Sequence, residues 1–372
     1  MLQNEMSKSQ YLPVPLNTSR FERIGGTFTL IGIVLSFLGL SWDIEWHADV
    51  GPDTFWTLPH LFVYAGSAIA GIACLTVCLI TTKRSKTKPN AAWVSLLGGR
   101  FHAPVGFVLA GFGSLGFLSF GLFDQWWHLI YGFDVLFSSP PHVGLFLSLL
   151  LTMWGSTLIF ARGSQVDSPR LCLSIAVTLG FGLPIISFLA IELGGFYLAY
   201  LFPAMMMTFG MALVLSITRR FWSVIGMSLC IFAFRIFNGY GIPYFNQAYA
   251  DYLGYSLRET ADIQAGIPIL TPAWMPVAAL VMSIVFFSWV ARGKKPQLGI
   301  ALATGLATPF LYVHSLLFQV IDATVVAMAL PMLAILGAGF GWIGWQVGVI
   351  FRSIGVSAVG EQNIHTKSND HV

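Results

Sequence analysis

The chain has 372 residues, of which 56% are hydrophobic and only 9% are charged, whereas an ordinary soluble domain is roughly 25% charged. Its mean hydropathy is +0.76 and its formal net charge is +3. This composition excludes a soluble domain, indicates a polytopic membrane protein, and gives no reason to expect nucleic-acid binding.

The N-terminal segment, residues 1–24, is polar and lacks the apolar core of a cleavable signal peptide. We therefore expect this segment to stay in the cytoplasm and the first apolar segment to remain in the membrane as a signal anchor. All four cysteines lie within apolar segments, so we expect no disulfide framework.

Ten apolar segments are candidates for membrane spans, since a helix needs about 20 apolar residues to cross the hydrocarbon core. The segments are continuously apolar rather than alternating, which favours helices over a β-barrel. Pro203 and Pro309 interrupt the sixth and the ninth. The expected spans are 25–46, 59–82, 104–128, 141–161, 171–191, 196–217, 221–240, 272–291, 298–319 and 326–350.

The predicted fold class is therefore all-α, a polytopic membrane bundle of about ten transmembrane helices. We expect four regions along the chain. They are the N-terminal segment 1–24, a duplicated four-helix metal-binding unit over 25–161, a six-helix region of unknown role over 171–352, and a disordered cytoplasmic tail over 353–372.

The basic residues predict the orientation of the bundle. With these spans, all of the 19 Lys and Arg residues except Arg235 and Arg258 fall on one side of the membrane. Because basic residues are enriched on the cytoplasmic side, we expect both termini in the cytoplasm and the protein in the plasma (inner) membrane. The longest outer connection, about 241–271, is aromatic and is a candidate lid.

One motif occurs twice at the outer ends of the first four spans. Each copy has an aromatic residue, an Asp, a Trp-His pair, a Gly, a second Asp and a Pro-His pair. The copies read WDIEWHADVGPDTFWTLPH from Trp42 and FDQWWHLIYGFDVLFSSPPH from Phe123. Because other residues differ while these positions are kept, we interpret the first four spans as a parallel internal repeat.

The kept Asp and His residues have the spacing of metal ligands. In each copy the Asp and the first His are four residues apart, which places both on one face of a helix. The second His follows a proline that suits the first turn of the returning helix. The two candidate ligand sets are Asp43, His47 and His60 in the first copy, and Asp124, His128 and His142 in the second.

Two imidazoles and one carboxylate form a ligand set for copper, zinc or iron. Three protein ligands leave coordination positions open, as a catalytic site requires. Asp53, Asp134 and Glu45 are candidates for orienting the imidazoles, and the Trp residues of the motif for an interfacial aromatic belt. The alternative is a mutually satisfied Asp–His pair or one step of a proton relay. Retention of the set in both copies favours metal binding.

The spacing Asp43-x3-His47-x12-His60, which crosses from one helix to the next, resembles the C subunit of the copper membrane monooxygenases. These are the particulate methane and ammonia monooxygenases. The second copy, with x13 before His142, resembles that subunit's later site, with Asp124 where methane-oxidising members have Asn. The resemblance covers about residues 25–161. It implies copper at both sites and, because the family acts with separate A and B subunits, partners of those types.

Two functions from different classes follow from these observations. The first is a copper-binding, oxygen-activating monooxygenase subunit for a small apolar substrate, with the open coordination position at the Asp43, His47 and His60 site. The second is a metal- or proton-coupled membrane transporter, and a non-catalytic assembly or sensing subunit is a third possibility. A transporter needs polar residues across the whole bilayer, whereas here they concentrate at the outer end, which favours a fixed site. A homo-oligomer is the alternative to A- and B-type partners.

Overall fold

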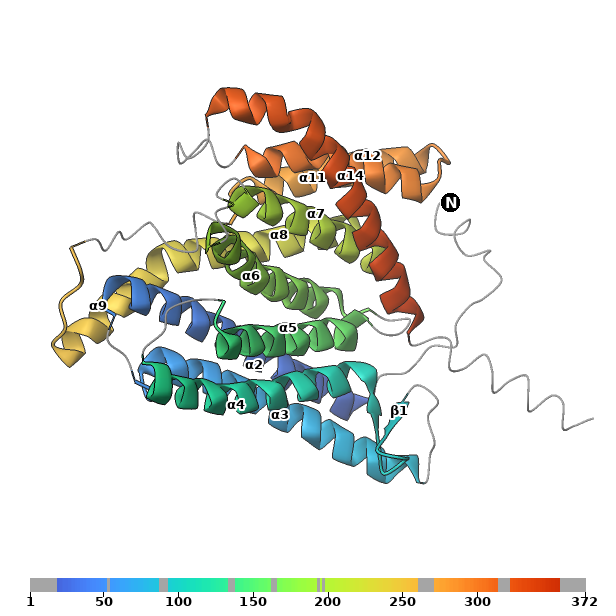
Figure 1. Cartoon of the computed structure of the whole chain (residues 1–372). Coiled ribbons are helices and arrows are strands. Elements are labelled where there is room, and N and C mark those ends of the chain that lie inside the picture. Colours follow the sequence, from blue (N-terminus) through green and yellow to red (C-terminus); the bar gives the residue numbers. More distant parts are fainter. Residues whose placement is uncertain are drawn as a thin grey trace, which may run out of the picture.

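The computed structural model of the chain is almost entirely helical (Figure 1). It describes residues 19–51, 54–86, 93–132, 138–161, 166–192, 195, 198–259, 271–313 and 322–354. Its helices are α2 (Arg20–Asp49), α3 (Leu58–Ser85), α4 (Val105–Tyr131), α5 (Pro140–Ala161), α6 (Ser168–Glu192), α7 (Leu198–Thr218), α8 (Phe221–Ile236), α9 (Ile242–Leu253), α11 (Met275–Ala291), α12 (Pro296–Tyr312) and α14 (Ala323–Ser353).

The lengths and composition of the helices confirm the expected class of a multi-pass, all-helical membrane protein. Within the described residues, eight helices are long and apolar enough to cross a membrane. The eighth and ninth expected spans correspond to α11 and α12, which have 17 residues each. The N-terminal segment as far as residue 18 and the tail from residue 355 lie outside the described residues.

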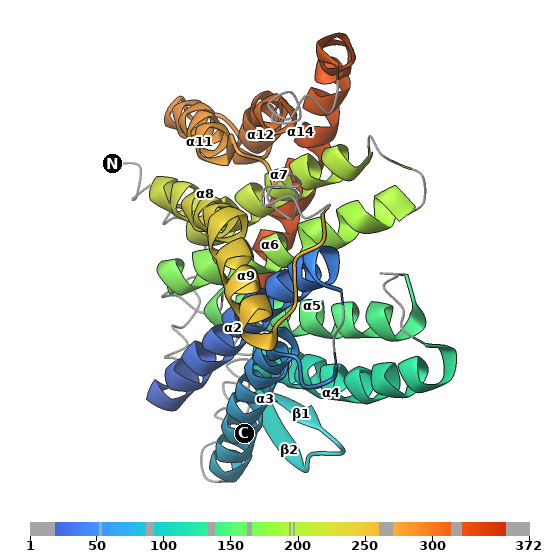
Figure 2. The same ribbon diagram turned by 90° about the vertical axis from the view of Figure 1, so that its left-hand side faces the viewer.

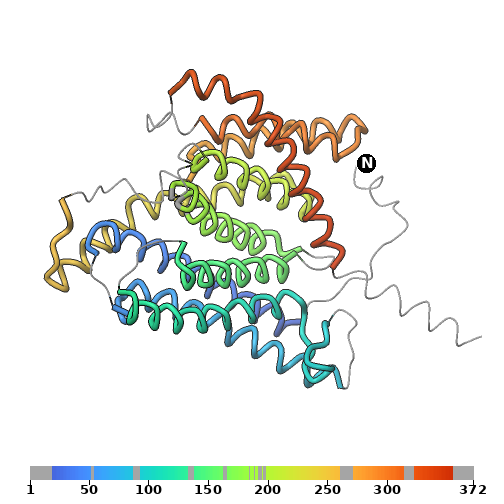
Figure 3. The backbone as a smooth tube through the Cα atoms, in the orientation of Figure 1, coloured from blue at the N-terminus to red at the C-terminus, as the bar shows by residue number. Residues whose placement is uncertain are grey.

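The helices pack as two groups joined by a middle layer. Helices α2, α3, α4 and α5 lie side by side, and α11, α12 and α14 form a second group at the opposite face (Figures 1 and 2). Helices α6, α7 and α8 connect the two groups. The tube in Figure 3 shows that α2 begins and α14 ends at the same end of the bundle.

Small residues let the first four helices approach each other closely in pairs. A Cβ on Gly32 of α2 would lie 2.5 Å from the carbonyl oxygen of Gly66 on α3. In the α4–α5 pair, a Cβ on Gly106 would lie 2.8 Å from the carbonyl oxygen of Gly155. Such backbone contact is typical of helix pairs in membranes, where small side chains replace the hydrophobic drive for packing. The two motif-bearing pairs are thus held together in the same way.

The seventh expected span, 221–240, is shorter than the helix that contains it, so the first part of the 241–271 connection is helical. Helix α8 continues through a π-helical turn, η2 (Phe237–Gly241), into α9, which ends at Gly254 with φ +77°. Glycine and proline are common where helices end, and Gly239, Gly241 and Pro243 lie here, but the buried Ile242 and Ala250 anchor α9 against the rest of the fold. Residues 260–270, the remainder of the candidate lid, lie outside the described residues.

A β-hairpin between α3 and α4 was not expected. Strands β1 (Trp93–Leu96) and β2 (Phe101–Pro104) pair antiparallel. Their turn contains Gly98 and Gly99, both at positive φ, and a Gly-Gly pair between alternating residues is a recognised hairpin signal. The hairpin lies at the end of α3 and α4 opposite to α9 (Figure 1).

The glycine contacts predict the effect of adding one methyl group to the α2–α3 interface. Gly66→Ala would press against the backbone of α2 at Gly32 and Ser36, and should lower the free energy of unfolding by about 1–3 kcal/mol. Gly226→Ala on α8, where a Cβ meets nothing within 4 Å, is the matched control and should be neutral or slightly stabilising. Thermal unfolding in detergent measures both, and equal melting temperatures would contradict this packing account.

Candidate metal centre

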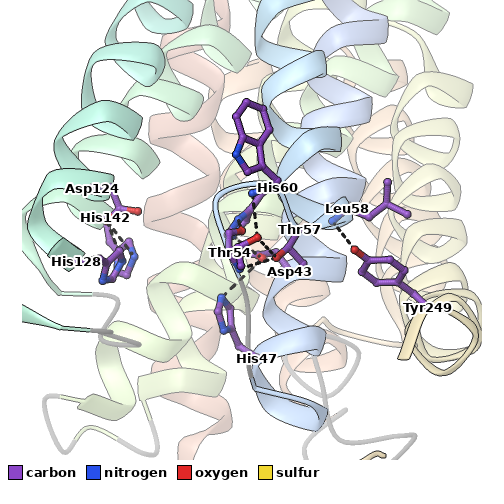
Figure 4. Close-up of polar contacts among 11 residues, drawn as sticks. Asp43, His47, Thr54, Thr57, Leu58, His60, Asp124, His128, His142 and Tyr249 are labelled. Carbon is purple, nitrogen blue, oxygen red and sulfur yellow. Dashed lines mark hydrogen bonds and ion pairs between the residues drawn. The ribbon is translucent and has the colours of Figure 1, made fainter. Parts of the chain in front are cut away.

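The first triad forms where the end of α2 meets the start of α3 (Figure 4). The Asp43 Oδ1 atom lies 3.7 Å from Nε2 of His47 and 3.0 Å from Nε2 of His60. The three side chains are between 14% and 24% exposed, so they are shielded but reachable from solvent. The structure thus brings together all three residues that the first motif copy predicted.

The second triad has the same construction at the end of α4 and the start of α5 (Figure 4). The Asp124 Oδ1 atom lies 3.4 Å from Nε2 of His128 and 3.5 Å from Nε2 of His142. Its side chains are between 20% and 24% exposed. The second copy of the motif therefore also converges, in spite of its one extra residue.

The donor atoms in each triad lie close to the separations that a metal ion requires. All three lie within 4.8 Å of one another in both triads. A tetrahedral shell with bonds of about 2.0–2.2 Å places neighbouring donors roughly 3.3–3.6 Å apart. The Asp–His distances of 3.0–3.7 Å bracket that value. Small side-chain adjustments would therefore complete a three-ligand site with open positions.

Backbone carbonyls orient one imidazole of each triad. Nδ1 of His60 lies 2.9 Å from the carbonyl oxygen of Thr54, and Nδ1 of His128 lies 3.1 Å from that of Gly132. Since a carbonyl only accepts hydrogen bonds, each Nδ1 is the donor, which leaves Nε2 as the ring nitrogen that faces the aspartate and that a metal ion would bind.

The glycine that both motif copies keep lies where a helix carrying two candidate ligands ends. Gly51 has φ +101° and Gly132 has φ +84°, a left-handed region that glycine adopts without strain. The adjacent Asp53 and Asp134 lie outside the described residues, so their role in orienting the imidazoles stays a prediction. Glu45 is buried beneath α9, where its backbone carbonyl faces Asn246.

Both triads line one cavity of about 1030 Å³. Between them the wall is aromatic: the ring of Tyr64 lies 5.9 Å from that of His60 and 6.3 Å from that of Phe117. On the other side, the ring of Phe146 lies 6.2 Å from that of His142. The two triads therefore open into a common, mainly apolar space.

These aromatic wall residues were missed in the sequence, although a signal was present. Tyr64 follows His60 by four residues, and Phe146 follows His142 by four. Helical geometry places each ring one turn deeper than a candidate ligand. The expectation of an aromatic belt was wrong for Trp42 and Trp46, which are 7% and 0% exposed and lie in the protein interior.

Comparisons with protein-family models, with curated proteins and with solved structures return no match for this chain.

The two triads predict one metal ion each. We expect copper-loaded protein to bind two ions per chain, His47→Ala or His128→Ala to bind one, and the double variant to bind none, because two ligands hold an ion poorly. His102→Ala, on β2 outside both triads, should bind as the parent does. Metal analysis after gel filtration measures the ratio, and equal, near-zero copper in all samples would contradict the metal assignment.

Proposed function

We propose that the chain is a membrane-embedded copper protein that acts as an oxygen-activating subunit of the copper-monooxygenase type on a small apolar substrate. The observation that carries this proposal is the placement of two Asp-His-His triads on one cavity with an aromatic wall. A substrate in this cavity would have access to both triads, and an apolar wall selects an apolar molecule.

The residues of each triad suit copper, although the same donors also bind zinc or iron. The likeness of both motif spacings to the C subunit of the copper membrane monooxygenases favours copper among these metals. The ligands would be Asp43, His47 and His60 at one site, and Asp124, His128 and His142 at the other. A bound copper ion would supply oxygen binding and activation at its open position.

The protein's own groups have separate tasks in this proposal. The carbonyl groups of Thr54 and Gly132 hold two imidazoles with Nε2 directed at the triads. Tyr64, Phe117 and Phe146 would hold the substrate by apolar contact and keep water away from the reacting region.

The proposed topology has ten spans, cytoplasmic termini and triads on the outer side of the plasma membrane. Two basic turns support this orientation, because basic residues are enriched on the cytoplasmic side. They are the α7–α8 turn, with Arg219 and Arg220, and the α11–α12 turn, with Lys294 and Lys295. Both lie at the end of the bundle away from the triads (Figure 1). The similar glycine contacts and triads of α2–α3 and α4–α5 support a parallel repeat over 25–161. A- and B-type subunits are the proposed partners, on the resemblance alone.

A transporter, the main alternative, needs polar groups along a path through the bilayer. The charged and imidazole groups of the cavity gather at one end of the bundle, whereas the apolar Val63, Phe117 and Leu149 also line it and lie one to two turns further along their helices. This distribution favours a fixed site over a transport path. Accumulation of copper in protein-containing vesicles, without oxidation of any substrate, would instead support transport.

The cavity predicts how a filling substitution changes activity. Gly121 lines the cavity one helical turn from Asp124, and a Cβ there meets its nearest heavy atom at 4.0 Å, so Gly121→Leu would occupy substrate space while all six triad residues are kept. We expect kcat/KM for a short alkane to fall by at least about tenfold, with unchanged copper content. Incorporation of ¹⁸O₂ by copper-loaded protein in nanodiscs is the assay.

The matched control for this substitution is Gly226→Leu, which adds the same side chain on α8 in open space. It should retain the parent's activity and copper content. Copper-loaded parent protein that yields no ¹⁸O product, with or without candidate A- and B-type partners, would contradict the proposed reaction but leave metal binding standing.

A further inference from the structure

In the described part of the chain, helix α9 and the residues that follow it pack against the helices of only one of the two triads. This segment, residues 242–259, is here named the α9 cap. It packs on α2 and lies over the ends of α2 and α3, whereas α4 and α5 lie to one side of it (Figure 2). No comparable packing of α9 on α4 or α5 occurs in the described parts of the chain.

Arg258 of the α9 cap completes the hydrogen bonding at the end of α2. The last carbonyls of a helix have no partner within the helix. At the end of α2, the carbonyl of Trp46 accepts from the backbone of Val50 and Gly51 at 2.9 and 3.0 Å. Arg258 supplies the donors for the next three carbonyl groups. Its side-chain Nη1 lies 3.2 and 3.3 Å from the carbonyl oxygens of residues 47 and 48. Its backbone N–H donates to the carbonyl oxygen of residue 49 at 2.7 Å.

One of these carbonyls belongs to His47, a ligand of the first triad. The guanidinium thereby fixes the backbone from which this imidazole projects, and its positive charge suits the negative end of the helix dipole. Gly51 leaves room for the guanidinium, because a Cβ at residue 51 would overlap Nη2 of Arg258. Arg258 also lines the shared cavity.

The α9 cap also holds the helix that supplies the third ligand. The Tyr249 hydroxyl accepts a hydrogen bond from the backbone N–H of Leu58, the first residue of α3, at 3.3 Å. His60 lies two residues further along (Figure 4). The ring of Tyr249 lies 4.9 Å from that of the fully buried Trp46. Both helices of the first triad are therefore tied to the same cap.

We propose that the α9 cap positions the ligands of the first triad, that Arg258 is its principal positioning residue, and that the two metal sites are consequently unequal. This assignment rests on the proposed metal binding. The proposal gives part of the region after residue 171 a role, which is to hold the backbone at His47 and near His60 in place. The second triad, on α4 and α5, does not depend on the cap.

The test compares Cu²⁺ binding at each triad separately in the full-length protein. His128→Ala/His142→Ala leaves the first triad alone, and His47→Ala/His60→Ala leaves the second. In the first background, Arg258→Gln should weaken Cu²⁺ binding by about 10- to 100-fold, the usual cost of removing a group that orients a ligand. It should also change the Cu²⁺ electron paramagnetic resonance spectrum. In the second background, Arg258→Gln should leave the Cu²⁺ affinity within about twofold of that of the His47→Ala/His60→Ala protein.

Two further variants separate positioning from general destabilisation. Arg258→Lys keeps the charge but not the forked donor, so it should lose less affinity than Arg258→Gln. Arg292→Gln removes an exposed arginine in the α11–α12 turn and should change neither site. Should Arg258→Gln fail to fold, Tyr249→Phe removes a single hydroxyl and should weaken the first triad alone.

Unchanged affinity and spectrum at the first triad in Arg258→Gln would overturn the assignment, and so would equal weakening of both triads. If Arg258→Gln does not fold, unchanged first-triad binding in Tyr249→Phe overturns it. Cu²⁺ binding by the parent is measured first, so a failure of the proposed metal binding itself is seen before any cap variant is compared.

Discussion

In each triad one carboxylate lies between two imidazoles at the end of an apolar helix pair, and the rest of the site depends on this arrangement. Ionisable groups near hydrocarbon are costly unless they are paired, hydrogen-bonded or bound to a metal. The Asp43 and Asp124 carboxylates meet this requirement through paired histidines on the neighbouring helix. The two helices of each pair must consequently stay in a fixed register, since a shift of one residue would turn a ligand away.

Close backbone contact supplies that register. Glycines bring the helices of each pair together deeper in the bundle than the triads. They are Gly32 and Gly66 in one pair, and Gly106 and Gly155 in the other. Glycines at positive φ, Gly51 and Gly132, then end the ligand-bearing helices at the level of the site. The cavity between the pairs follows from their side-by-side packing, with Tyr64 and Phe117 in contact across it.

The triads were predictable from sequence because local rules determine them. Spacing of four residues places Asp43 beside His47, and a proline marks the turn that returns His60 to them. The shared cavity and the α9 cap depend on contacts between segments far apart in the chain, such as that of Arg258 with the end of α2, which a hydropathy pattern does not encode. The extension of α8 into α9 was missed because packing of buried residues outweighed the local effect of glycine and proline.

Each triad is proposed to be a separate copper site on a common cavity. Anomalous diffraction at the copper edge, from crystals of copper-loaded protein, would locate the ions. We expect two peaks, each about 2.0–2.2 Å from one aspartate oxygen and two Nε2 atoms of its triad. Absence of copper from both triads in crystals whose copper content has been verified, or peaks only at the cysteines, would contradict the proposal.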